Sequence, residues 1–92
     1  MNKIEEVYKI RRYDNKDCKL GEWKVTYESG YIDNKKSAEK MLRMYGDGCA
    51  VGEDVTYYDS RWNRDKTEVT FQSLEGRAIK FELVACSLII PE

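Results

Sequence analysis

One stretch of the chain has the spacing of an amphipathic helix, and it lies among segments that have the pattern of strands. Its apolar side chains recur at i, i+3, i+4 and i+7, at Ala38, Met41, Leu42 and Tyr45. Asp33 or Asn34 can cap its first turn, and Gly46 is suited to the left-handed conformation that ends many helices. Because a helix with one apolar stripe needs one surface to cover, the sequence predicts a single helix packed on one face of a sheet.

Five segments around this helix are predicted to be strands. They cover residues 4–13, 22–28, 50–58, 67–74 and 78–90. This order predicts an α+β fold, ββαβββ, with one amphipathic helix on a mainly antiparallel sheet of about five strands. The 92 residues are enough for one hydrophobic core and are interpreted as a single domain, 1–92.

The alternation within each segment predicts which side chains are buried. In segment 22–28, Trp23, Val25 and Tyr27 alternate with charged or polar residues, which favours one buried face. Val69 and Phe71 do the same in segment 67–74. The charges of segment 4–13 are typical of an edge strand. Segment 78–90 is apolar on both faces beyond Leu83, which is typical of a central strand or of one that is covered on a second side.

The composition argues against several classes of function. The chain has no histidine, so catalytic mechanisms that use a histidine base are excluded, and we expect no enzymatic activity. Its three cysteines, Cys18, Cys49 and Cys86, form no Cys-x-x-Cys motif, so we expect no metal and no cofactor. We interpret them as free thiols in the cytoplasm, with Cys49 and Cys86 buried.

No stretch of the sequence has the pattern of a membrane span or of a signal peptide. A span needs about 20 consecutive apolar residues, and no run in this chain approaches that length. The first residues include Glu5 and Glu6, where a signal peptide needs an apolar core. We therefore expect no association with a membrane.

The most suggestive binding motif is a tryptophan between two arginines. Arg61, Trp62 and Arg64 fall in a segment, 59–66, that is otherwise polar and predicted to be a turn, and Tyr58 precedes it. Tryptophan and arginine are enriched at the centres of protein interfaces. These four residues are therefore our candidate partner-binding site. In the alternative interpretation, Trp62 folds back onto the sheet and the arginines cover it.

A second candidate surface is basic. Its residues come from the first predicted strand and the turn after it, at Lys9, Arg11, Arg12, Tyr13 and Lys16. Cations interleaved with an aromatic side chain can follow a nucleic-acid backbone. Neighbouring acids dilute the charge, so an ordinary solvated strand explains the same pattern.

These observations favour a small non-enzymatic interaction protein over any enzyme. We expect an inhibitor or adaptor that binds a protein partner through an aromatic and charged surface, a type that phages and mobile elements often encode. The alternative is a nucleic-acid-binding module that uses the basic hairpin and Trp62. The apolar run at the C-terminal end, with Val84, Leu88 and Ile90, either packs under a loop or joins a partner, and a homodimer formed through it is one hypothesis.

Overall fold

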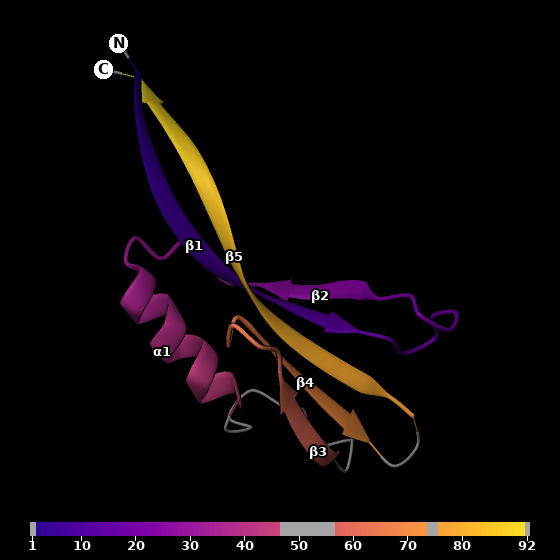
Figure 1. The fold of residues 1–92 in the computed structure, drawn as a ribbon. Helices are drawn as coiled ribbons and strands as arrows, with labels where there is room; N and C mark the ends of the chain where they lie inside the picture. Colours follow the sequence, from indigo (N-terminus) through magenta and orange to yellow (C-terminus); the bar gives the residue numbers. More distant parts are fainter. Residues whose placement is uncertain (1, 47–56, 74–75, 92) are drawn as a thin grey trace.

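The computed structural model describes residues 2–46, 57–73 and 76–91, and it confirms the predicted order of elements (Figure 1). That order is β-β-α-β-β-β, with one helix on a five-stranded antiparallel sheet. The elements are β1 (Asn2–Asp14), β2 (Lys24–Glu28), α1 (Lys35–Gly46), β3 (Tyr57–Trp62), β4 (Glu68–Ser73) and β5 (Ala78–Pro91). The described residues do not include Val51 and Val55 of the third predicted strand, or Cys49 just before it.

The strands lie in the order β2-β1-β5-β4-β3. The central position predicted for the C-terminal strand is confirmed, because β5 is the third of the five. The edge position predicted for the first strand is wrong: β1 lies between β2 and β5. Its charges are accommodated because Lys9 and Arg11 pair with Glu28 of the neighbouring strand β2.

The longest ladder in the sheet joins β1 to β5. Their register runs without a shift from Asn2 opposite Pro91 to Asp14 opposite Ile79. The other strands accompany only part of this ladder: β2 pairs with residues 11–14, and β4 pairs with residues 78–82. Residues 2–7 and 84–91 therefore form a two-stranded arm that projects from the body and carries both chain ends, as Figure 1 shows. The molecule is correspondingly elongated, with a longest dimension of 52 Å.

The core lies between α1 and one face of the sheet. Its buried side chains come from the helix and from three strands, at Ile10, Leu42, Val69, Phe71, Ile79 and Phe81. The predicted apolar stripe is confirmed, because Ala38 and Leu42 are buried and Met41 and Tyr45 pack against the core. Tyr45 stacks on Phe81 with ring centroids 4.9 Å apart. Burial and a hydrogen bond with Tyr27 raise the pKa of Tyr45.

The two ends of the helix differ in how well the sequence predicted them. The Asn34 side chain accepts a hydrogen bond from the Ser37 amide at 3.1 Å, so the predicted cap is confirmed. Gly46 is instead the last residue of α1, and the described glycines with positive φ are Gly21 and Gly76. Among the residues that the structure describes, no helix is long and apolar enough to cross a membrane.

The buried face predicted for the second strand is wrong. Trp23, Val25 and Tyr27 are 37%, 49% and 49% exposed, and every residue of β2 is exposed. The register shifts beside Thr26, so Tyr27 lies opposite Arg12 while Val25 lies opposite Tyr13. Because adjacent residues of β1 point to opposite faces, this bulge also separates Val25 and Tyr27. The edge strand β2 consequently has no single face to bury.

The third strand extends further along the chain than predicted. Residues up to Trp62 belong to β3, and the turn begins at Asn63 instead of residue 59. The Asn63 side chain closes this turn by accepting hydrogen bonds from the amides of Thr67 and Glu68, at 2.9 and 3.1 Å. Cys86, predicted to be buried, is only half-buried because it lies on the arm.

The helix end depends on a close contact between a glycine and an aromatic ring. A Cβ atom at Gly46 would overlap the indole of Trp62, whereas a Cβ atom at Gly30 would meet open space. We expect Gly46→Ala to lower the free energy of unfolding by about 1–3 kcal/mol, because the tryptophan must move. The matched control, Gly30→Ala, should change it by less than about 0.5 kcal/mol. Urea denaturation of both variants tests this, and equal effects would contradict it.

A buried carboxylate links the hairpin turn after β1 to the start of β5. Asp14 is 3% exposed, and the guanidinium of Arg77 donates to it from Nη2 at 2.7 Å and from Nε at 3.3 Å. The Lys16 amide donates a third hydrogen bond at 2.8 Å. Burial alone would raise the pKa of Asp14, but these bonds and the charges of Arg77 and Arg12 outweigh it, so the pKa lies below its usual value.

This carboxylate makes stability depend on pH in the acid range. Its folded-state pKa is depressed, so its contribution is fully present above the unfolded pKa of about 4 and is lost as the pH falls through the folded value. We expect Asp14→Asn to cost roughly 2 kcal/mol at pH 7, because Arg77 loses its partner. The variant should also lose less stability than the wild type between pH 4 and pH 2. Urea denaturation at pH 7, 4 and 2 measures both effects. If the wild type and the variant lost the same free energy of unfolding between pH 4 and pH 2, the acid dependence would not come from Asp14.

Candidate interaction surfaces

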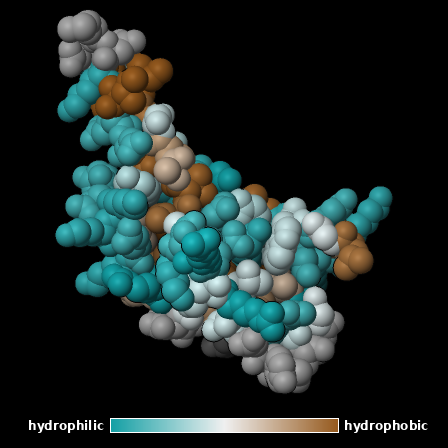
Figure 2. All heavy atoms as spheres, in the orientation of Figure 1, coloured by the Kyte–Doolittle hydropathy of each residue, from teal (hydrophilic) through white to brown (hydrophobic). Residues whose placement is uncertain are grey.

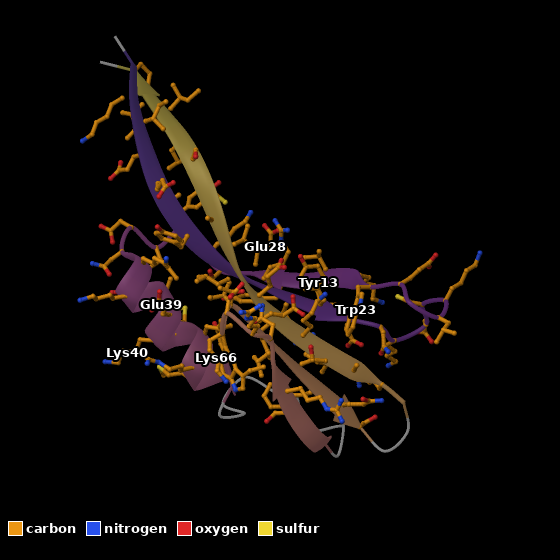
Figure 3. The ribbon with its side chains drawn as sticks, viewed as in Figure 1. Tyr13, Trp23, Glu28, Glu39, Lys40 and Lys66 are labelled. Atoms are coloured by element: carbon orange, nitrogen blue, oxygen red, sulfur yellow. The ribbon has the colours of Figure 1, made fainter. Side chains whose placement is uncertain are left out.

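A groove runs between α1 and the turn that joins β3 to β4. Its volume is about 630 Å³, which is within the usual size of a ligand-binding cleft. One wall is a helical stripe four residues apart, formed by Lys35, Glu39 and Arg43. The opposite wall contains Trp62 and residues 65–67. In Figure 3, Lys66 lies beside the helix, close to the part that carries Glu39.

Trp62 belongs partly to the core and partly to this groove. It lies opposite Val69, which is fully buried, so its side chain is on the helix side of the sheet. The ring packs against the core and against Gly46, and it is half-buried. The Lys66 ammonium lies 5.8 Å from the ring centroid. Trp62 therefore does fold back onto the sheet, as the alternative interpretation predicted, while still contributing to the groove.

The groove is lined by charges of both signs, with an excess of cations. Lys35, Arg43 and Lys66 contribute three positive charges, and Glu39 and Asp65 contribute two negative ones. The same helix carries two further exposed lysines, Lys36 and Lys40, outside the groove. This distribution attracts an acidic ligand, and the two carboxylates restrict where its negative groups can lie.

Of the residues predicted as the partner-binding site, Arg61 and Trp62 lie on opposite faces of the sheet. Arg61 lies opposite Thr70, on the sheet face away from the helix, because successive residues of a strand point to opposite sides. Arg64 is exposed in the turn that follows Trp62. The side chain of Tyr58 lies outside what the structure describes. Trp62 thus joins a different set of neighbours, from α1 and residues 65–67, which sequence reasoning missed.

The predicted basic hairpin is also divided between two faces. Lys9, Arg11 and Tyr13 share the uncovered face of the sheet, and Arg12 lies on the other side, where it donates to Thr26 at 2.7 Å. Lys16 is exposed in the connection between β1 and β2. Glu28 accepts from Lys9 at 3.2 Å and from Arg11 at 2.7 Å, and these two bonds lower the pKa of Glu28. The pairing offsets much of the positive charge that a nucleic acid would contact.

A second aromatic and cationic cluster lies on the uncovered face, and the sequence analysis did not identify it. The Lys80 ammonium lies between two rings, 4.6 Å from the centroid of Tyr13 and 4.7 Å from that of Trp23. The Tyr13 hydroxyl donates to Glu82 at 2.8 Å. Figure 3 shows Tyr13 and Trp23 near each other on the β1–β2 hairpin. These residues come from β1, from β5 and from the position just before β2, so no local pattern in the sequence could have indicated the cluster.

The comparisons with known proteins give no match: no family model, no curated protein and no solved structure corresponds to this chain. Across residues 2–46, 57–73 and 76–91, no group of three or more cysteine or acidic side chains is placed to hold a metal ion. A functional assignment therefore has to rest on the surfaces described above.

The two tryptophans should differ in what they contribute to stability. Trp62 packs on the core, so Trp62→Ala should lower the free energy of unfolding by about 2–4 kcal/mol. Trp23 is more exposed and lies just before the edge strand β2, so Trp23→Ala should cost about 1 kcal/mol or less. Urea unfolding followed by circular dichroism compares them. A larger loss for Trp23→Ala would show that the packing described for Trp62 is wrong.

Proposed function

We propose that this chain is a non-enzymatic interaction domain of the inhibitor or adaptor type, which binds an acidic segment of a protein partner in the groove beside Trp62. The observation that carries this proposal is the position of Trp62. It is half-buried in one wall, with Lys66 beside its ring and with Lys35 and Arg43 across the groove. We place the protein in the cytoplasm, consistent with the free thiols of Cys18 and Cys86.

The structure of the groove supports a peptide-like ligand. An aromatic side chain that is already fixed against the core loses little conformational entropy on binding, which favours its use as an anchor. Cations on both sides of the ring can pair with carboxylates of a partner. The helical wall is continuous with the exposed cationic surface of Lys36 and Lys40, so an acidic partner would be attracted before it docks.

A protein partner fits this groove better than a nucleic acid does. Glu39 and Asp65 would repel closely spaced phosphates, whereas an acidic peptide can place its carboxylates beside the cations alone. On the basic hairpin, Lys9 and Arg11 are already paired with Glu28. Nucleic-acid binding remains the alternative function, and the experiment below distinguishes the two.

The test compares charge reversals that differ only in whether the residue lines the groove. Lys35→Glu and Arg43→Glu change groove residues, and Lys36→Glu and Lys40→Glu make a matching change from positive to negative on the same helix outside it. A tag at either chain end lies at the tip of the arm, away from the groove (Figure 1). Each tagged protein is used to capture partners from a lysate of its source cells, with and without nuclease.

We expect the wild type and both control variants to capture the same partner protein, with or without nuclease. Either groove variant should reduce the amount captured about tenfold or more. If nuclease abolishes capture and retention falls steeply with salt, the nucleic-acid function replaces this proposal. If the groove and control variants lose the partner equally, binding depends on the general charge of the helix and the groove assignment fails.

We also propose that two copies of the chain associate through the C-terminal half of β5, which contains Val84, Leu88 and Ile90. The support comes from the arm. Ile89 and Ile90 are 67% and 37% exposed there, and two strands without further cover form a marginally stable unit in water. Figure 2 shows hydrophobic atoms concentrated on the arm near the chain ends. A monomer at high concentration in a sedimentation experiment would overturn this second proposal.

A further inference from the structure

Both outer edges of the arm lack a partner strand among the described residues. On the β1 side, the last contact towards the tip is Tyr8, which exchanges backbone hydrogen bonds with Ile32 at 2.8 and 2.7 Å. On the β5 side, the last contact is the Leu83 amide, which donates to the carbonyl of Thr67 at 2.8 Å. Beyond these points, residues 2–7 and 84–91 pair only with each other (Figure 1).

These last contacts determine which backbone groups point outward from the arm. In an antiparallel ladder the amide and carbonyl of successive residues point alternately to the two sides. Since the Leu83 amide points away from β1, the amides and carbonyls of Ala85, Ser87 and Ile89 do so as well. They form a row of donors and acceptors along the outer edge of β5, for which residues 2–46, 57–73 and 76–91 provide no partner strand.

The two edges differ in charge. Residues 83–90 of β5 contain no charged side chain, and Ser87 at the middle of the free edge is exposed. The facing part of β1, residues 3–10, contains Lys3, Glu5, Glu6 and Lys9. Natural proteins place charges on edges that must not pair, so an uncharged, apolar edge is a template for another strand. The free edge of β5, rather than that of β1, is therefore the surface that is open to strand pairing.

From this edge we infer that β5 pairs antiparallel with β5 of a second copy, around a twofold axis at Ser87. This inference rests on the self-association proposed above and adds its register. Ser87 then lies opposite its own copy and Ala85 lies opposite Ile89, so all the outward amides and carbonyls find partners. The two β1–β5 arms become one four-stranded sheet.

The side chains of this strand are complementary to themselves in that register. Each large residue lies opposite a smaller one: Ile90 opposite Val84, Leu88 opposite Cys86, and Ile89 opposite Ala85. No charged side chains meet across the new strand pair, because the charges of β1 lie on the outer strands. A twofold symmetric interface requires this kind of self-complementarity, which an unrelated partner strand would not need.

A segment of the same chain is a poorer candidate to cover this edge. Residues 47–56 are not among the described residues, and they connect Gly46 at the end of α1 to Tyr57 at the start of β3. Both of these anchor points lie at the end of the molecule opposite to the tip of the arm, as Figure 1 shows. A second copy can present the same edge in the antiparallel direction, because it is not tethered to these two anchor points.

The first test uses two proline variants of untagged protein at directly paired positions. Ser87 and Glu6 lie opposite each other, and the amides of both point out of the β1–β5 ladder. Proline at either position therefore spares that ladder but blocks strand addition at its own edge. We expect the wild type and Glu6→Pro to sediment as dimers and Ser87→Pro as a monomer, at concentrations at least tenfold above the wild-type dissociation constant.

The second test examines the twofold axis by charge exchange. Ser87→Lys and Ser87→Glu each place like charges opposite each other in a homodimer and opposite charges in a mixed dimer. We expect each variant alone to dimerise at least about fivefold more weakly than the wild type, and a mixture of the two to recover dimer. Native mass spectrometry distinguishes the mixed species when one variant is isotopically labelled.

The outcomes separate this register from the self-association on which it rests. A monomeric wild type would overturn both. A wild-type dimer that Glu6→Pro disrupts and Ser87→Pro leaves intact would place the interface on β1 and overturn the inference alone. A dimer that neither proline affects would exclude strand pairing at the arm. If Ser87→Pro abolishes the dimer but the mixture of Ser87→Lys and Ser87→Glu does not recover it, the twofold register is excluded.

Discussion

The structure depends on the long antiparallel ladder between the first and the last strand. β1 and β5 are far apart in the sequence, yet their register continues from Asn2 opposite Pro91 to Asp14 opposite Ile79. Closing the intervening chain costs entropy, and the many backbone hydrogen bonds of this ladder help to compensate for it. β2 and β4 pair with the two sides of the ladder, β3 is added beyond β4, and α1 packs across one of its faces.

This ladder divides the molecule into two parts with different physical roles. In the body, α1, β3 and β4 bury Ile10, Phe81 and their neighbours, and the groove forms where the helix meets the turn after Trp62. In the arm, Val7 is buried at the base, whereas Ile4, Ile89 and Ile90 are exposed and the outer edge of β5 has no partner strand among the described residues. The two proposed interactions therefore use separate ends of the molecule, and one copy could engage in both.

Charge is also distributed by the pairing of strands, rather than by the composition of any one segment. The cations of β1 that suggested nucleic-acid binding are balanced by Glu28 across the sheet. Asp14 is buried without a large penalty because Arg77, which is remote in sequence, binds both of its oxygens. Lys80 is placed between Tyr13 and Trp23 by the same cross-strand register.

The sequence by itself determined the order of the elements, the buried stripe of the helix and the inward residues Val69 and Phe71, because these follow from local periodicity. It also indicated a central C-terminal strand, but the run that is apolar on both faces, beyond Leu83, lies in the arm, and only residues 79–82 pair with strands on both sides. The tertiary structure alone decided that Trp23 and Val25 are exposed, since that depends on a bulge and on an edge position. It likewise decided that Trp62 faces the helix and that the arm is uncovered, because strand order and register are set by contacts between distant residues.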